Sequence, residues 1–341
     1  MVLVFTLCSN NYLAQANTLG NSLLKCIPTY KFIIGLVDRK QESFNYSKIP
    51  YEIIEVEQIG IPYFEEMRMR YNIIELNTAC KPFFYQYFFK AINPRTIIYL
   101  DPDIEVFAPF KELEEELASS DIVITPHFTT PFYDDKWQAE EDFLNSGLYN
   151  LGFIAINNTE IGNSMVSWWS ERMRNKAYMD FRRGLFYDQI WINFVPLFFK
   201  KVKVFTNIGY NVAYWNLHER IISERNGNYF VNETQPLVFY HYASYRPLNP
   251  GVISTGQNRH TLVERTDIAP LFNNYCKMVL QNNYEKLVKY PCYFVDHKEK
   301  IDRQRLIQKI QEIPKYKRAI GKVVRWIIRK FNIIMDYSTL K

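Results

Sequence analysis

The sequence lacks several features by which common protein classes are recognised. No apolar run approaches the ~20 residues needed to span a bilayer. The five cysteines are scattered and form no C-x-x-C pair, which argues against a disulfide framework or a zinc site and favours a reducing compartment. The apolar start lacks a basic leader and a cleavage pattern, so we expect residues 2–8 to form a first strand and not a signal peptide.

Nucleotide-binding motifs of the commonest kinds are also missing. The chain has no G-x-G-x-x-G and no Walker A sequence, which leaves a dinucleotide site or a P-loop without support. Internal repeats and low-complexity segments are absent as well. What the chain has is a hydrophobic content of 48% and an aromatic content of 16% in 341 residues, enough for a sizeable core. We therefore expect either one large α/β domain or a domain plus an extension.

Charge is unevenly placed along the chain. Residues 298–341 hold 13 Lys and Arg against four Asp and Glu, so the tail carries +9 and residues 1–297 carry −4 of the total of +5. A mildly acidic body makes nucleic acid an unexpected partner. Within the tail, residues 314–334 place apolar side chains on one helical face and basic ones on the other, which predicts peripheral contact with an anionic membrane. The alternative is that this helix packs on the body with its basic face in solvent. If the helix contacts the membrane, we expect the protein to be cytoplasmic and peripheral on the inner face of the cell membrane.

Strand and helix patterns alternate through most of the chain. Short runs of β-branched and aromatic residues predict strands, and apolar residues at helical spacing predict helices. This alternation indicates a mostly parallel sheet flanked by helices. The expected strands are 2–8, 31–37, 51–56, 97–100, 121–126, 149–157, 202–206 and 237–240, and the expected helices are 14–25, 64–92, 111–119, 161–176 and 259–287.

The central motif is a hydrophobic strand that stops at Asp101-Pro102-Asp103. Pro102 removes a backbone donor, so the strand ladder should end there. Ligands of open α/β sheets bind beyond the carboxyl ends of such strands. Two carboxylates at that place suit Mg²⁺ or Mn²⁺ together with diphosphate oxygens. An ordinary solvated acidic turn is the alternative.

Further candidate residues follow at other element ends. His241 ends the last expected strand and has Arg246 five residues on, a pairing suited to metal plus phosphate. Asp188 and Gln189 stand at an expected helix start, where Asp188 could be catalytic, a helix cap, or both. Lys81 precedes Pro82, which predicts a lysine at a helix N-terminus facing the site, or simply a first-turn lysine.

Together these residues resemble glycosyltransferases of the GT-A fold, and are most similar to glycosyltransferase family 8, over residues 1–250. The resemblance implies that Asp101, Asp103 and His241 hold Mn²⁺ or Mg²⁺ and that Asp188 and Gln189 are the catalytic, sugar-side residues. An N-x-G strand is matched by Asn150-Leu151-Gly152 or, less well aligned, by Asn145-Ser146-Gly147. The family has a lysine-proline pair after its histidine, where this sequence has Arg246-Pro247. The residues implied to bind the nucleotide-sugar are Thr6, Ser9, Tyr12 (stacking on the base), Lys81, Asp101, Asn150, Gly152 and Arg246.

The same resemblance implies an organisation and an activity. Residues 1–250 would be the catalytic domain, 251–297 a helical extension packed on it, and 298–341 the basic amphipathic tail. The expected reaction moves a hexose from a nucleotide-sugar, in the first instance a UDP-sugar, with retention of configuration. The acceptor would be a saccharide or a lipid-linked glycan in bacterial surface glycan synthesis. Two alternatives stay open: a phosphatase of the haloacid dehalogenase type with Asp101 as nucleophile, and a non-catalytic sugar- or partner-binding protein.

Overall fold

A computed structural model describes residues 1–312 of the chain. The chain forms two units, Met1–Phe294 and Val295–Lys341, and helix α10 (Tyr293–Glu312) begins at the end of the first. In residues 1–312 no helix is long and apolar enough to cross a membrane. The amphipathic segment 314–334 lies outside the described residues, and the predicted domain boundaries at 250 and 297 stay predictions.

The first unit is built on a seven-stranded sheet. Every neighbouring pair is parallel except those of β7, which runs antiparallel to both β4 and β6. This arrangement confirms the predicted mostly parallel α/β fold. In sheet order the strands are β10 (Val202–Val204), β6 (Ile122–Pro126), β7 (Tyr149–Asn157), β4 (Thr96–Leu100), β1 (Val2–Cys8), β2 (Lys31–Leu36) and β3 (Glu52–Glu55).

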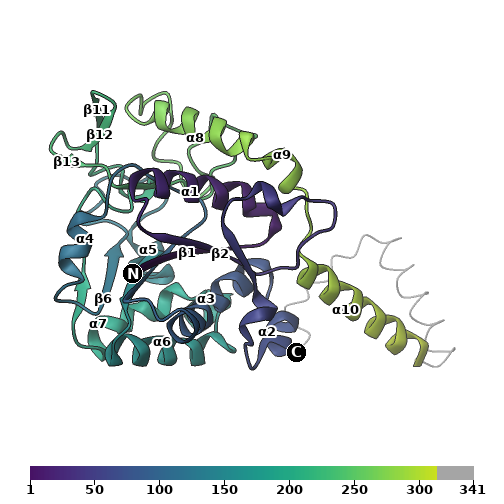
Figure 1. The fold of residues 1–341 in the computed structure, drawn as a ribbon. Coiled ribbons are helices and arrows are strands. Elements are labelled where there is room, and N and C mark those ends of the chain that lie inside the picture. The colour runs from purple at the N-terminus through teal and green to yellow at the C-terminus, as the bar shows by residue number, and fades with distance from the viewer. Residues whose placement is uncertain (313–341) are drawn as a thin grey trace. The chain divides into compact units, whose positions relative to one another are not determined.

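Helices cover both faces of this sheet (Figure 1). On one face lies α1 (Leu13–Cys26), with α8 (Ala269–Gln281) and α9 (Tyr284–Leu287) packed against it. On the other lie α3 (Ile73–Ala91) and α6 (Glu160–Met173), which pack on each other. Because both faces are covered, the central strands are buried throughout, and β4 has no exposed residue. This burial explains why their sequences are continuous apolar runs.

The predicted helix 64–92 is two helices. The first, α2 (Phe64–Arg70), ends before Asn72, whose side chain accepts hydrogen bonds from the amides of Ile74 and Glu75 and so begins α3. Pro82 therefore lies inside α3, and Lys81 lies in its middle. The prediction that Lys81 stands at a helix N-terminus was wrong.

Smaller elements complete the unit. The predicted loop 129–143 contains the start of helix α5 (Glu140–Ser146), and the predicted helix 259–287 begins only at Ala269. The remaining helices are α4 (Lys111–Glu116) and α7 (Val195–Phe198), with 3₁₀ turns that include η1 (Asn10–Tyr12) and η5 (Gln189–Phe194). The remaining strands are β5 (Ile104–Val106), β8 (Met179–Asp180), β9 (Leu185–Phe186), β11 (Ile222–Arg225), β12 (Asn228–Val231), β13 (Gln235–Pro236) and β14 (Phe239–His241).

One of these small pairings places the site. Strand β5, which follows the Asp101-Pro102-Asp103 turn, pairs antiparallel with β14, so that His241 lies opposite Ile104. The amide of Tyr242 then donates to the carbonyl of Asp103 over 2.8 Å. Residues nearly 140 positions apart in the chain are thereby held at the carboxyl end of β4.

Candidate metal and ligand site

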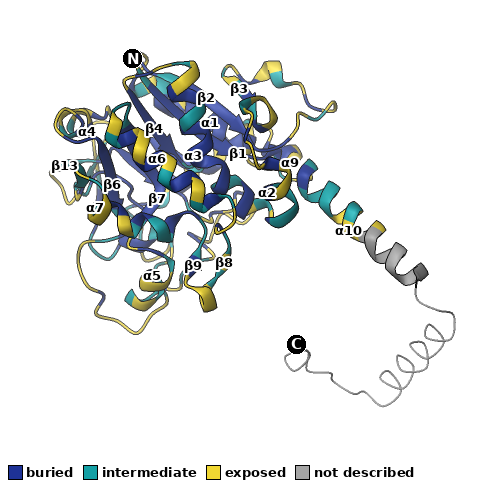
Figure 2. Ribbon diagram, turned by 90° about the horizontal axis from the view of Figure 1, so that it is seen from below, coloured by how far each residue is buried: buried dark blue, intermediate teal, exposed yellow. Residues whose placement is uncertain are grey.

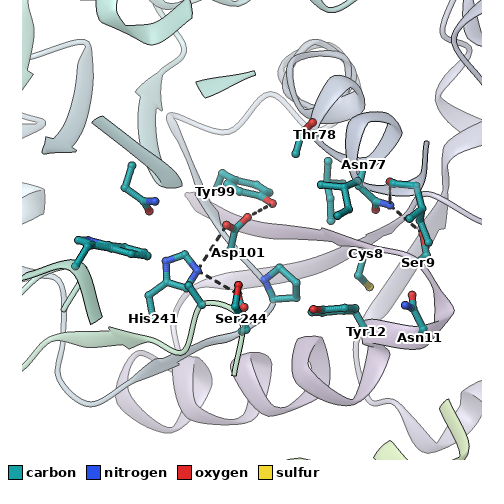
Figure 3. A pocket seen from close by; sticks show the side chains of 18 residues that line it. Cys8, Ser9, Asn11, Tyr12, Asn77, Thr78, Tyr99, Asp101, His241 and Ser244 are labelled. Atoms are coloured by element: carbon teal, nitrogen blue, oxygen red, sulfur yellow. Dashed lines mark hydrogen bonds and ion pairs between the residues drawn. The ribbon is translucent and has the colours of Figure 1, made fainter. Parts of the chain in front are cut away.

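A cavity of about 470 Å³ opens beyond the carboxyl ends of β1 and β4 (Figure 3). Its walls come from β1 and η1, the first turns of α3, the β4–β5 turn, β7, and the segment after β14. This is the edge at which open α/β sheets bind ligands. The polar and aromatic lining residues include Ser9, Asn11, Tyr12, Asn77, Thr78, Tyr99, Asp101, Asp103, Asn150, Trp215, His241 and Ser244.

Asp101, Asp103 and His241 converge on one side of this cavity. The imidazole Nε2 of His241 lies 3.2 Å from Oδ1 of Asp103 and 3.7 Å from Oδ2 of Asp101. One ligand atom from each residue falls within 4.8 Å of the other two. Tyr99 donates its hydroxyl to Oδ1 of Asp101 over 2.6 Å, and the amide of Asp101 donates to the carbonyl of Gly152, so the first carboxylate is held from two directions.

The donor set fits a hard divalent cation. Two carboxylates and one imidazole in a half-buried wall need a positive charge between them, and oxygen and nitrogen ligands of this kind suit Mn²⁺ and Mg²⁺. Burial lowers the pKa of His241, but the Asp103 and Asp101 carboxylates outweigh burial and the pKa is raised overall.

Gly152 leaves room for this arrangement. A Cβ at position 152 would stand 2.8 Å from Nδ1 of His241 and 2.8 Å from Oδ1 of Asn150, closer than real Cβ contacts. We expect Gly152→Ala to push the imidazole away from the two carboxylates and to weaken Mn²⁺ binding at least tenfold. Titration calorimetry with Mn²⁺ measures this. Gly251→Ala, where nothing lies within 4 Å of the added Cβ, is the matched control, and equal affinity of both variants would contradict the close approach.

Only some of the predicted nucleotide-binding residues line the cavity. Tyr12 and Ser9 line it, and Ser9 accepts a hydrogen bond from the Asn77 side chain over 2.9 Å (Figure 3). Thr6 is fully buried within β1 and does not line the cavity. Arg246 is exposed and also lies outside the lining. Tyr12 lines the same cavity as Asp101, Asp103 and His241 (Figure 3).

Lys81 and Asp188 form a buried ion pair behind the cavity. The Lys81 ammonium lies 2.7 Å from Oδ2 of Asp188, donates to the carbonyl of Leu151 over 2.9 Å, and stands 4.2 Å from the centre of the Tyr99 ring. Burial raises the pKa of Asp188, and the adjacent Lys81 charge opposes that rise. Asp188 precedes the 3₁₀ helix η5, but its side chain makes no cap hydrogen bond because it is directed to Lys81.

Gln189 and Asn150 connect this pair to β7. The Gln189 side chain accepts from the amide of Leu151 over 3.1 Å and donates to the carbonyl of Ser146 over 2.9 Å. Asn150 accepts from the amide of Gly152 and from the side chain of Asn211, both over 3.1 Å. The predicted sugar-side residues therefore fix the start of β7, from which Asn150 reaches the cavity.

Sequence reasoning missed several lining residues. Asn77 and Thr78 come from α3, and the Asn72-x-x-Glu75 capping signal could have placed that helix start correctly. Tyr99 lies two residues before Asp101 on β4, so period-2 alternation places both side chains on one face. Ser244 lies in the irregular segment after β14 and carries no comparable signal, whereas Trp215, in the 3₁₀ helix Tyr214–Asn216, belongs to the aromatic segment 210–218 that the sequence offers as a candidate wall of the acceptor site.

Glu105 belongs to a different cavity, of about 630 Å³, between α1, α8 and β12. It is buried and accepts a hydrogen bond from the Tyr242 hydroxyl over 2.8 Å, and burial raises its pKa to about 7. A carboxyl whose pKa is raised on folding keeps its proton in the folded state at pH values where the unfolded state has released it. The free energy of unfolding therefore falls as pH rises from ~4.5 to about 7.

We expect Glu105→Gln to flatten that part of the stability profile and to raise the unfolding free energy at pH 8 by about 2 kcal/mol. Urea unfolding from pH 4.5 to 8 tests this; parallel profiles for variant and wild type would contradict it.

Comparison with curated proteins finds two relatives. The chain is 30% identical to YfnF, an uncharacterised protein of Bacillus subtilis (strain 168), over 175 residues, which are 49% of this chain and 55% of YfnF. It is 22% identical to YfnD of the same organism over 246 residues, which are 70% of this chain and 76% of YfnD. The chain thus spans about half the length of the first relative and three quarters of the second. No family model matches.

Solved structures share the architecture. The galactosyltransferase LgtC, in complex with donor and acceptor sugar analogues, aligns with a TM-score of 0.50 and 15% identity over 81% of this chain and 95% of that one. The bifunctional glycosyltransferase WbbM, in its apo form, aligns with the same TM-score and identity over 82% of this chain and 51% of that one. The mostly parallel sheet flanked by helices is therefore the fold of GT-A glycosyltransferases.

Proposed function

We propose that this protein is a metal-dependent glycosyltransferase of the family 8 type. It transfers a hexose from a nucleotide-sugar, in the first instance a UDP-sugar, with retention of configuration. The acceptor is a saccharide or a lipid-linked glycan of a bacterial surface polysaccharide. The observation that carries the proposal is the cluster of Asp101, Asp103 and His241 on the wall of a cavity with room for a nucleotide, on a fold shared with glycosyltransferases.

The cavity divides into regions that suit the parts of such a donor. Asp101, Asp103 and His241 would hold Mn²⁺ or Mg²⁺, which when bound neutralises the charge of the departing nucleoside diphosphate. Tyr12 offers an aromatic face for the base, and Ser9 and Asn77 offer polar groups beside it. Arg246, exposed five residues after His241, could swing to the diphosphate as a second positive charge.

On the other side of the cavity, Asn150 presents its side chain to the sugar. Asp188 and Gln189 lie behind it, joined to β7 through Leu151, and in this geometry they orient Asn150 and the β7 backbone. The Asp188 carboxylate, paired with Lys81 behind the sugar side of the cavity, would favour positive charge that develops on the sugar ring. We assign this electrostatic role to Asp188.

The phosphatase alternative is less well supported. It requires Asp101 as a nucleophile with its attacking oxygen free, whereas Asp101 shares one oxygen with the Tyr99 hydroxyl and directs the other to His241. A non-catalytic binding protein would not need a buried imidazole between two carboxylates. We also propose that residues 314–334 contact the inner face of the cell membrane, in keeping with their basic amphipathic pattern.

Donor hydrolysis tests the proposal. The purified full-length protein is incubated with UDP-, GDP- and CMP-sugars in the presence of Mn²⁺ and, separately, of EDTA. We expect hydrolysis of one donor class that chelation abolishes. The absence of both turnover and metal-dependent nucleotide binding with every donor would overturn the proposal.

A further inference from the structure

A buried histidine lies behind the sugar side of the cavity and has no part in the metal cluster. His127 directly follows β6, which lies beside β7 within the buried sheet (Figure 2). The residue is 5% exposed, and its ring lies 4.8 Å from that of Phe143 and 5.3 Å from that of Trp215. An imidazole enclosed in this way costs free energy unless its nitrogens are hydrogen-bonded. The partners of those nitrogens therefore show what the residue does.

The two partners fix where the proton of the imidazole lies. Nδ1 of His127 lies 3.1 Å from the carbonyl oxygen of Leu148, which can only accept, so Nδ1 carries the proton. Burial lowers the pKa of His127 to about 4, so the ring is neutral near pH 7. A neutral imidazole has a single N–H group, which leaves Nε2 as an acceptor. Nε2 lies 3.3 Å from the side-chain nitrogen of Asn150, so the Asn150 amide group donates to it.

The other contacts of Asn150 hold its amide group in the same orientation. Its oxygen accepts from the backbone amide of Gly152 and from the side chain of Asn211, both over 3.1 Å. Its nitrogen gives one hydrogen to His127 and directs the second to Oε1 of Gln189 over 3.5 Å. This last contact is the weakest of the four, because the Gln189 oxygen already accepts from the β7 backbone over 3.1 Å. It is therefore the contact that a ligand in the cavity can replace.

We propose that His127 is a positioning residue that holds Asn150 as a hydrogen-bond donor toward the hexose of the nucleotide-sugar. With one amide hydrogen given to His127, the other is left for an acceptor in the cavity, which a hydroxyl oxygen of the sugar supplies. The amide oxygen cannot turn to the sugar without leaving the donors of Gly152 and Asn211 unpaired. The site therefore favours a hexose with a hydroxyl at this place over the corresponding deoxy sugar. The role toward the hexose rests on the proposed function, whereas the contact between the two side chains does not.

Three substitutions separate the two ring nitrogens. His127→Phe keeps a ring against Phe143 and Trp215 but removes both nitrogens. His127→Asn places an amide near the position of Nδ1 and can keep the contact with Leu148, whereas His127→Gln places one near Nε2 and can accept from Asn150. We expect kcat/KM for hydrolysis of the nucleotide-sugar to fall about tenfold in the Phe and Asn variants and to stay within about threefold of wild type in the Gln variant.

A second readout separates positioning from a general structural role. The affinity for Mn²⁺ and for the nucleoside diphosphate of the hydrolysed nucleotide-sugar, measured by calorimetry, should be unchanged in all three variants, because Asn150 is assigned to the sugar. His260→Phe, at a half-buried histidine outside the cavity lining, is the matched control and should hydrolyse like wild type. Equal rates in the three His127 variants, or a parallel loss of nucleoside diphosphate affinity, would overturn the proposal.

The ligand-free protein tests the contact itself without any nucleotide-sugar. Nitrogen-15 NMR of the full-length protein with labelled histidine should show the proton of His127 on Nδ1 and none on Nε2. In a double-mutant cycle, the effects of His127→Phe and Asn150→Ala on the unfolding equilibrium constant should fall short of additivity by about fivefold or more. A proton on Nε2, or additive effects, would overturn the inference even if a nucleotide-sugar is hydrolysed. The expected tautomer and coupling without turnover of any nucleotide-sugar would support the contact and count against the proposed function.

Discussion

Replacing Asp103 by asparagine is expected to reduce donor hydrolysis by about 10²- to 10³-fold. The substitution keeps the shape of the side chain but removes one of the two negative charges that, with His241, form the candidate metal site. A divalent ion would then be held by one carboxylate and one imidazole, too few to compete with water. Hydrolysis with saturating Mn²⁺, and Mn²⁺ affinity measured by calorimetry, should fall together.

The control for this prediction is Asp135→Asn. Asp135 is an exposed carboxylate on the segment before α5, outside the cavity, so its neutralisation should leave both hydrolysis and Mn²⁺ affinity unchanged. If Asp103→Asn hydrolyses the donor as fast as wild type, or if EDTA leaves both proteins active, the cluster has no metal-dependent role. A loss of hydrolysis with unchanged Mn²⁺ affinity would mean that other residues bind the metal.

The fold was predictable because its strands and helices carry strong local signals. Strand β4 is fully buried and is followed by Asp101-Pro102-Asp103, where proline and charge stop the ladder, and the structure ends the strand at Leu100. Helix boundaries were harder. Pro82 is a helix breaker by local chemistry, yet α3 tolerates it because its buried aromatic neighbours Phe83, Phe84 and Tyr85 hold the helix in the core. Tertiary packing there outweighed local preference.

The site was predictable only where the resemblance or a strand end pointed to it. His241 was identified by its position at a strand end, but nothing in the sequence shows that β14 pairs with β5 and brings the imidazole to Asp103. The Lys81–Asp188 pair was also invisible, because two residues 107 positions apart give no local signal of contact. Long-range contacts of this kind depend on the whole fold, and sequence spacing does not encode them one by one.

That buried pair gives the largest expected effect on stability. Replacing Lys81 by methionine keeps the length of the side chain but leaves the Asp188 carboxylate almost fully buried without its cation. Breaking one side of a buried ion pair typically costs ~3–5 kcal/mol, and the carbonyl of Leu151 loses its donor as well. We expect the unfolding free energy of Lys81→Met at pH 7 to fall by about that amount, as measured by urea denaturation.

The pH dependence of the variant identifies the cause. Without Lys81, the rise that burial causes in the pKa of Asp188 loses its main opposing interaction, so the folded state holds a proton that the unfolded state releases. The stability deficit relative to wild type should therefore be small at low pH. It should grow as pH rises above the folded pKa of Asp188 in wild type, which lies above the ordinary ~3.9. Adding Asp188→Asn to Lys81→Met removes the unpaired charge and should recover stability at pH 7 while hydrolysis stays low.

The control is Lys90→Met, at an exposed lysine near the end of the same helix, which should change the unfolding free energy by less than ~0.5 kcal/mol. A deficit independent of pH, or equal for both lysines, would mean that Lys81 acts through packing and that Asp188 is held ionised by other groups.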